Sequence, residues 1–465
     1  MRSLLYKILL LGIILLPKQT VLSQEIISLE DFLGYVKGYH PFLKQANLKL
    51  SESQAKLLKS RGAFDPKFQL NQKEKTFEAL SYYTISETSI DIPTYYGFSI
   101  ELSSQQAEGT FLNPENSIKN DRLYGIGASV DLGKGLLSNP RQTALKQAKI
   151  FTKQAKEENA LQINSILNEA SHAYLDWYKA YKSYEIYTQF VTNAKFRFEG
   201  VKKRMLTGDM AIIDTIEARI AYQQRILSKE NARLELRKKA FETSNFIWIN
   251  EQAVILNEGV SPKINDQFFN QNFMPDTLQI IDHPKIRALE YKQQQLQLEK
   301  RLQLNNLLPE VTLQYQWLSE TDPLQNLAFS IDPNNNTTGL KVAIPLFLRK
   351  ERANLKLASF KLEGMELEQA QTKTTLQNKI NSLFIQSKWL EKQKAIANEI
   401  VNDYHALFEG EKKKFLAGES SLFLVNARES NLIEAMLRAI AMEVALKKAQ
   451  ITYYYEISFP DYSGD

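Results

Sequence analysis

Residues 141–205 read RQTALKQAKIFTKQAKEENALQINSILNEASHAYLDWYKAYKSYEIYTQFVTNAKFRFEGVKKRM, with no proline and a single glycine, Gly200. Apolar side chains recur here at alternating steps of three and four residues, which is the seam of a coiled coil. A helix of this length would extend about 100 Å, whereas helices in compact domains run to roughly 10–14 residues. The stretch therefore predicts a rod. Its seam comprises Ile163, Ile166, Ala170, Ala173, Trp177, Ala180, Tyr184, Tyr187, Val191, Ala194 and Phe198.

The N-terminus has the features of an export signal. Arg2 and Lys7 flank the start of an apolar run from Leu9 to Leu16, and Ser23 supplies a small residue before Gln24. We therefore expect residues 1–23 to be a signal peptide. The alternative, a membrane anchor, is disfavoured because the run falls well short of the roughly 20 apolar residues that span a bilayer as a helix.

Charge and cysteine content narrow the function. The chain has 58 Lys and Arg against 53 Asp and Glu, and three of these bases precede Gln24, so the mature chain is nearly neutral. A nucleic-acid surface needs a strongly basic face, and we expect no such partner. With no cysteine the chain has no disulfide framework. No run of 18 apolar residues follows the signal, which predicts no transmembrane helix, although barrel strands escape such a scan.

Proline and glycine residues that recur at constant offsets indicate an internal two-fold repeat. His283-Pro284 follows His40-Pro41 by 243 residues, and Pro309 follows Pro66 by the same number. Further along, Leu355-Lys356 follows Leu145-Lys146 by 210 residues, as does Gly418 after Gly208. The chain is thus predicted to be duplicated. The first half must carry 33 extra residues between Pro66 and Leu145, and their role cannot be inferred from the sequence.

Two regions, 67–132 and 310–346, alternate with a period of two residues, as strands do. Polar loops, including the long Glu78 to Asn120 region, are expected between the strands, so each half should provide one strand pair. An exported pair with apolar residues outward suits an outer-membrane barrel wall, but a half-buried soluble sheet fits the alternation equally well. The clearest apolar positions are Tyr124, Ile126, Ala128, Val130, Val311, Leu313, Tyr315, Trp317, Leu340, Val342 and Ile344.

Helix lengths indicate how each half is built. Long helical hairpins are predicted at 141–249 and 349–456. In each half, the return helix of the hairpin and the shorter helix led by Pro41 or Pro284 together match the length of the long helix. We therefore expect these two to stack end to end beside the long helix. The fold class is therefore α+β with a sequence repeat. The first repeat is expected at 24–249 and the second at 276–458, with a linker at 250–275 and a tail at 459–465.

This order of parts resembles the TolC family of outer-membrane efflux proteins over nearly the whole mature chain. The most specific residues are Val342-Ala343-Ile344-Pro345-Leu346-Phe347, similar to the family's strand-to-helix junction, and two turn motifs at 204–209 and 414–421. The resemblance implies a homotrimer with four strands per chain, a twelve-stranded transmembrane β-barrel in outer-membrane lipid, and a long α-helical periplasmic barrel. It also implies passive conduction, with a periplasmic adaptor (membrane fusion) protein and an inner-membrane pump of the RND or ABC type as partners.

The two turn motifs are the candidate functional sites. Gly208 and Gly418 stand where the chain reverses between antiparallel helices, a position that often needs positive φ, and the flanking charges suit the helix dipoles. This pattern alone explains a stable turn. The resemblance implies, in addition, that the turns dock onto the adaptor through Arg204, Leu206, Gly208, Asp209, Phe415, Gly418, Glu419 and Ser420.

The resemblance also implies a role for two acids after the first turn. Asp214 and Glu217 match positions where family members place polar or acidic residues at a closed aperture. Three chains could form a carboxylate ring there. The corresponding stretch of the second half, Leu422 to Asn426, lacks acids, so a gate is expected from the first hairpin only.

Features of an enzyme are sparse in the sequence. No HExxH, phosphate-binding glycine loop or G-x-S-x-G occurs. His40 and His283 are interpreted as caps of proline-led helices. We expect no catalysis, no cofactor and no metal. Two other classes remain as alternatives: an exported coiled-coil structural or adhesin protein, which would explain the rods but not the strand pairs, and an extracellular helical enzyme, which would need a polar constellation that the sequence lacks.

Overall fold

A computed structural model describes residues 25–118, 122–135, 138–249, 251–257, 259–265, 269, 282–321 and 332–457. The chain forms two compact units, and each draws on both halves of the sequence. The first unit comprises 1–44, 163–275 and 379–458, and the second comprises 45–162, 276–378 and 459–465. The expected signal peptide, part of the 250–275 linker and the C-terminal tail lie outside the described residues.

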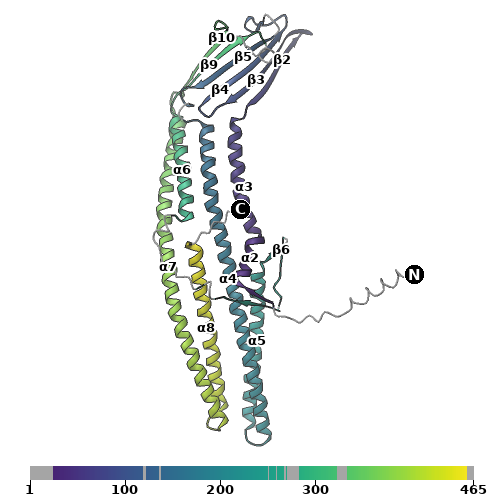
Figure 1. The fold of residues 1–465 in the computed structure, drawn as a ribbon, viewed down its shortest axis with the longest axis vertical. Helices are drawn as coiled ribbons and strands as arrows, with labels where there is room; N and C mark the ends of the chain where they lie inside the picture. The colour runs from purple at the N-terminus through teal and green to yellow at the C-terminus, as the bar shows by residue number, and fades with distance from the viewer. Residues whose placement is uncertain are drawn as a thin grey trace, which may run out of the picture. The chain divides into compact units, whose positions relative to one another are not determined.

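Four long helices confirm the two predicted hairpins (Figure 1). Helix α4 (Pro140–Leu206) is followed by α5 (Ile212–Ser244), and α7 (Arg349–Leu416) by α8 (Leu422–Ile457). The return helix α5 ends before the predicted residue 249. Thr243 and Ser244 donate their hydroxyls to carbonyls four residues earlier, and the hydroxyl of Ser244 accepts the N–H of Leu256 at 2.9 Å. These side chains end the helix where the short strands β6 (Trp248–Ile249) and β7 (Gln252–Ala253) begin.

Both proline-led helices begin as predicted. Helix α3 (Pro41–Arg61) follows His40, and α6 (Pro284–Asn305) follows His283. The Nδ1 atom of His283 accepts the backbone N–H of Lys285 at 3.0 Å, and Nδ1 of His40 accepts that of Phe42 at 3.3 Å. Each imidazole therefore satisfies a donor that the first turn leaves without a helical partner. The predicted capping role is confirmed.

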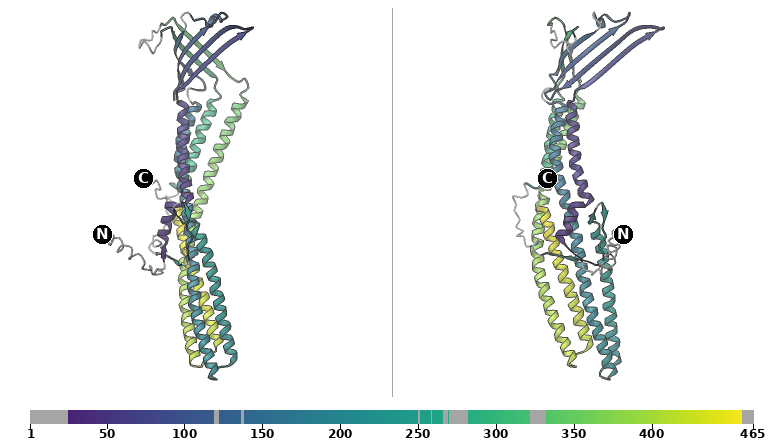
Figure 2. Two further views of the ribbon diagram at one scale, coloured as in Figure 1. Left: turned by 90° about the vertical axis from the view of Figure 1, so that its right-hand side faces the viewer. Right: turned by 45° about the vertical axis from the view of Figure 1, so that its right-hand side comes forward.

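The second unit contains a six-stranded antiparallel sheet. Its strands are β2 (Lys67–Phe77), β3 (Leu80–Pro93), β4 (Phe98–Glu108), β5 (Leu123–Asp131), β9 (Glu310–Ser319) and β10 (Asn336–Ala343). The order across the sheet is β10-β9-β5-β4-β3-β2. Figure 2 shows that the sheet is twisted, as antiparallel sheets of L-residues are.

This sheet corrects two sequence predictions. The region from Glu78 to Asn120 was expected to be a polar loop, but it contains β3 and β4. The four strands expected per chain are therefore six among the described residues. Polar residues concealed these strands because Ser, Thr, Glu and Gln fill most positions of 84–91 and 103–108 on both faces, whereas the prediction relied on apolar alternation.

In the first unit, α8 packs against α4 along much of its length. Asn164 of α4 donates to the carbonyl of Tyr455 at 3.0 Å, and Lys448 pairs with Asp176 at 2.7 Å. A core of buried side chains then joins both hairpins near their turns and comprises Ile186, Phe190, Val201, Ala218, Phe408, Phe415, Leu422, Val425, Leu432 and Ile433. Because this core takes side chains from all four helices, it holds the two turns together.

A small parallel strand pair completes the first unit. Strand β1 (Glu25–Ser28), which precedes α2 (Leu29–Tyr39), pairs with β8 (Val260–Lys263). The buried hydroxyl of Tyr174 donates to the carbonyl of Ile27 at 2.7 Å and accepts the N–H of Lys263 at 2.9 Å. Burial raises the pKa of Tyr174, so the hydroxyl keeps its proton and bridges both strands.

Within the described ranges, no helix combines the length and the apolarity that a membrane crossing requires.

Candidate functional site: the two helical turns

The turn between α4 and α5 is closed by backbone bonds around Gly208. This glycine has φ +83°. Its N–H donates to the carbonyl of Met205 at 3.1 Å, and the N–H of Asp209 donates to that of Arg204 at 2.9 Å. These two bonds form a Schellman motif, which needs a left-handed residue at the position of the glycine. The hydroxyl of Thr207 adds a bond of 2.9 Å to the carboxylate of Asp209.

The turn between α7 and α8 repeats this backbone. Gly418 has φ +81°, its N–H donates to Phe415 at 3.2 Å, and the N–H of Glu419 donates to Lys414 at 2.9 Å. The side-chain support differs from that of the first turn. Ser420 donates to Glu411 of α7 at 2.5 Å. Both glycines are thus explained by the positive φ of their turns, as the sequence predicted.

The surface of the turns is apolar where docking was expected. Leu206 is 73% exposed and Leu416 is 71% exposed. The first residues of the outgoing helices, Ile212, Ile213 and Phe423, are exposed as well.

Phe415 differs from the other predicted docking residues. The sequence placed it on the docking surface, but only 9% of it is exposed and it belongs to the core that joins the hairpins. The seam period explains the difference, because Phe408 and Phe415 are seven residues apart on α7 and both face the core. Of the remaining candidates, Gly208, Asp209, Gly418 and Glu419 are exposed, while Arg204 and Ser420 are half-buried.

The two candidate gate acids have partners within the chain. The carboxylate of Asp214 accepts the N–H of Ala211 at 3.2 Å, which places it as a cap on the first turn of α5. Glu217 accepts the side-chain N–H of Asn426 of α8 at 3.2 Å. Both acids therefore stabilise the turn region of one chain, and a ring formed by three chains stays a prediction.

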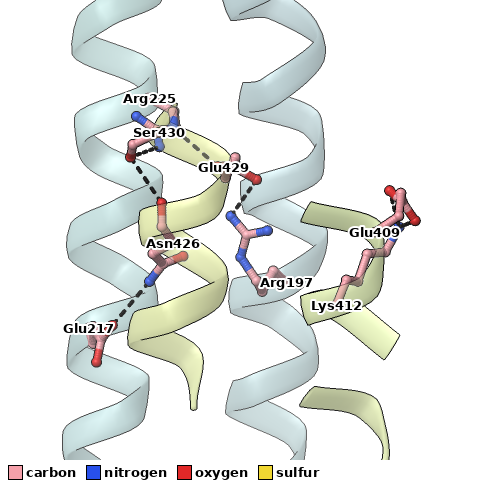
Figure 3. A network of polar contacts seen from close by, with 8 residues as sticks. All are labelled: Arg197, Glu217, Arg225, Glu409, Lys412, Asn426, Glu429 and Ser430. Atoms are coloured by element: carbon pink, nitrogen blue, oxygen red, sulfur yellow. Dashed lines mark hydrogen bonds and ion pairs between the residues drawn. The ribbon is translucent and has the colours of Figure 1, made fainter. Parts of the chain in front are cut away.

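A buried acid joins the two hairpins close to the turns (Figure 3). Glu429 of α8 has no exposed surface. Its Oε2 accepts from Nη2 of Arg197 of α4 at 2.7 Å, and its Oε1 accepts from Nε of Arg225 of α5 at 3.1 Å. Arg225 also donates to Ser430 at 2.7 Å. One carboxylate thus fixes three helices with charge-assisted hydrogen bonds, which are shorter and stronger than neutral ones.

The sequence analysis did not single out Glu429. A signal was present in α8. Leu422, Val425, Glu429 and Leu432 follow one another at steps of three and four, so the acid occupies a position of the buried seam. A charged residue at such a position is almost never buried without a partner. No group of three or more His, Asp or Glu suited to a metal ion occurs among the residues with described positions.

Comparison with known proteins agrees with this architecture. Residues 279–454 match the family described as Outer membrane efflux protein. A search of curated protein sequences gives no significant match. Among solved structures, CusC has a similar fold, with a TM-score of 0.69 at 13% identity over 92% of each chain. Its structures concern the conformational changes that accompany folding and transmembrane channel formation.

Two further channels have the same fold. The outer membrane channel CmeC of Campylobacter jejuni gives a TM-score of 0.66 at 13% identity, covering 94% of this chain and 87% of its own. The open state of the MtrE outer membrane channel of Neisseria gonorrhoeae gives 0.59 at 13% identity, covering 92% of this chain and 88% of its own.

The chain thus has the fold of outer-membrane channel proteins. Residues 279–454 match the outer membrane efflux proteins, and over this part of the chain the resemblance inferred from the sequence is confirmed.

Proposed function

We propose that this protein is the outer-membrane exit duct of a tripartite efflux or type I secretion system. Three copies form the duct, which conducts small molecules or toxins passively. The apolar face of the sheet contacts outer-membrane lipid, and the helices extend into the periplasm. The turns after α4 and α7 dock onto a periplasmic adaptor, which leads to an inner-membrane pump.

The observation that carries this proposal is a pair of exposed apolar seams in the first unit. On α5, large apolar side chains are exposed at every seventh residue, which is the period that packs one helix against another. On α7, a second exposed seam has steps of four and seven residues. The first seam comprises Ile213, Ile220, Leu227, Leu234 and Phe241, and the second comprises Ile385, Trp389, Ile396, Ile400 and Leu407.

Two different seams favour a closed ring of identical copies. Figure 1 draws α7 and α5 at opposite edges of the helices of this unit. A contact between the α7 edge of one copy and the α5 edge of the next joins unlike surfaces, and such a contact generates a ring when its rotation closes. Burial of both seams would remove ten large apolar side chains per copy from water, and each contributes about 1.5–3 kcal/mol when fully buried.

Assembly is tested by cross-linking at matched heights. Leu227 of α5 and Ile400 of α7 lie at nearly equal distances along their helices from the turns of their hairpins. The chain has no native cysteine, so the double variant Leu227→Cys with Ile400→Cys reports on this contact alone. We expect oxidation to give dimers and trimers on a denaturing gel. Each single variant should remain monomeric, and a ladder from the singles, or none from the double, would contradict the ring.

Export is tested at the turns. In cells that depend on this channel, Leu206→Asp together with Leu416→Asp should raise intracellular accumulation of an exported dye severalfold, because acids replace the apolar docking surface. Phe196→Asp is the matched control, since Phe196 is equally exposed, at 80%, but lies further from the turn on α4. Trimer formation should be normal in both variants. Unchanged export in the double variant would contradict a role of the turns in adaptor docking.

A further inference from the structure

One face of the six-stranded sheet has two apolar rows, and β3 and β4 contribute to them. Directly paired residues of neighbouring strands point to the same side. One row across the sheet joins apolar residues of five strands in succession, namely Phe68, Ile90, Leu102, Ile126 and Trp317. A parallel row joins Phe98, Val130, Leu313 and Leu340 of β4, β5, β9 and β10. Along these two rows apolar side chains therefore continue from the first half to the second, whereas the row of Gln72, Ser86 and Gln106 on the same face is polar.

The opposite face is polar and is cross-linked over β5. Gln316 of β9 donates to Ser103 of β4 at 2.6 Å, and Gln314 donates to Glu101 of β4 at 3.0 Å. These bonds pass over Gly125 and Gly127 of β5. A Cβ at Gly125 would overlap the side chains of Gln316 and Ser103, so glycine is required for this contact. Strand β4 is thus tied to β9 through side chains as well as to β5 through its backbone.

The edge strands of the sheet are β2 and β10, and β5 lies inside it with β4 and β9 as its paired neighbours. Strand β2 pairs only with β3, and β10 pairs only with β9, among the residues with described positions. All neighbours are antiparallel, so β2 and β10 run in opposite directions. The β10 edge of one copy can therefore pair with the β2 edge of the next and continue the alternation. Strands β3 and β4 cannot leave this wall unless their ladders with β2 and β5 break.

We propose that β3 and β4 are wall strands, so that a trimer closes a ring of eighteen strands. This inference rests on the proposed trimeric duct and assigns its pore size. Because barrel diameter grows roughly in proportion to strand number, the ring is about 1.5 times as wide as one of twelve strands. Barrels of this size leave an aqueous channel. The polar face of the sheet lines the pore. A pore of this width with a polar lining is suited to bulky, water-soluble solutes.

The position of the extra residues supports this assignment. When the halves are aligned by the two repeat offsets, the excess length of the first half falls between Pro66 and Leu145, and β3 and β4 lie within that part. Deleting residues 80–108 would leave only 78–79 and 109–122 between β2 and β5. The second half has a connection of equal length, 320–335, between β9 and β10. The deletion variant therefore gives the first half the strand pair that the second half already has.

Single-channel conductance in planar bilayers tests the pore size. Pore cross-section scales with the square of the diameter, so deletion of residues 80–108 should reduce conductance to about half or slightly less. An unchanged conductance would place β3 and β4 outside the wall. The variant, like the full chain, must migrate as a trimer that heat dissociates for this comparison to hold.

Cysteine cross-linking gives an answer that does not depend on the deletion variant or on channel activity. In the full chain inserted in membranes, a short thiol cross-linker should join Phe98→Cys to Val130→Cys, which pair between β4 and β5. By the repeat offsets of 243 and 210 residues, Leu70 and Val130 correspond to Leu313 and Leu340, which pair between β9 and β10. The cross-linker should not join Leu70→Cys to Val130→Cys, because β3 and β4 separate these positions in the sheet. The reverse result would overturn the inference. Absence of any conductance or trimer, with the Phe98 cross-link present, would instead reject the proposed duct.

Discussion

The two helical turns resemble each other more closely than the two strand regions do. The turns around Gly208 and Gly418 have the same pair of backbone hydrogen bonds and nearly the same φ. The strand regions differ, since the first half supplies four strands of the sheet and the second half two. Around the turns the side chains differ as well, because the buried acid Glu429 belongs only to the second hairpin. Backbone geometry is thus shared between the halves, whereas strand number and buried charge are not.

The largest effect is expected at the buried acid. Glu429→Ala should lower the free energy of unfolding by about 3–5 kcal/mol, because Arg197 and Arg225 would be left as buried charges without their carboxylate. Glu409→Ala is the matched control in Figure 3, since Glu409 pairs with Lys412 at 3.3 Å on the surface. Its loss should cost less than about 1 kcal/mol. Denaturant unfolding of the purified protein measures both, and equal losses would contradict the assigned role of Glu429.

The turn glycines come next. Gly208→Val and Gly418→Val should each cost about 1–3 kcal/mol and impair export while leaving trimer assembly intact. No atom lies within 4 Å of a Cβ built at either glycine, so the cost comes from the positive φ alone. Gly200→Ala, inside α4 with equally open space, should instead stabilise by roughly 0.5–1 kcal/mol. A clear difference between the two valine variants in dye export would show that the two turns are not equivalent in docking.

The helix caps should show a smaller effect and also test the gate. Asp214→Ala and Ser421→Ala should each cost about 1 kcal/mol, because Asp214 accepts the N–H of Ala211 and Ser421 that of Leu424. Hydrogen exchange in the first turns of α5 and α8 measures this. Asp214→Asn keeps an acceptor but removes the charge. If Asp214 is only a cap, this variant should leave the cation selectivity of the channel unchanged, and altered selectivity would favour a carboxylate ring.

The smallest effect is expected from pH at the proline-led helices. Burial lowers the pKa of His40, so the folded chain binds a proton at that site less readily than the unfolded chain, whose histidine titrates near about 6.5. The stability that neutral His40 contributes is therefore complete above about pH 6.5 and is lost as the pH falls toward the lowered folded value. The thermal midpoint should decrease from pH 7 to pH 5. In His40→Asn this decrease should be smaller, and an identical decrease would exclude His40 as its source.

The sequence predicted the elements whose signals are local and periodic. The apolar seam placed α4 within one residue at each end, and the His-Pro pairs marked the starts of α3 and α6. Strands β3 and β4 escaped because Ser, Thr and Gln occupy both faces in the parts away from Ile90 and Leu102. Phe415 was misplaced because its exposure depends on which seam position it occupies. The partners of Glu429 lie 232 and 204 residues away in sequence, and no single-sequence pattern links such distant residues.

The strand pair held by Tyr174 has a consequence for the order in which the chain matures. Strand β1 pairs with β8, which is synthesised only after α4 and α5 are complete, and domains generally fold from the N-terminal side during synthesis. Residues 25–28 are among the first of the described chain to emerge, yet their partner strand and the hydroxyl that bridges the two are made afterwards. Strand β1 must therefore stay without its partner until the first hairpin has been synthesised, and the β1–β8 ladder can form only after that.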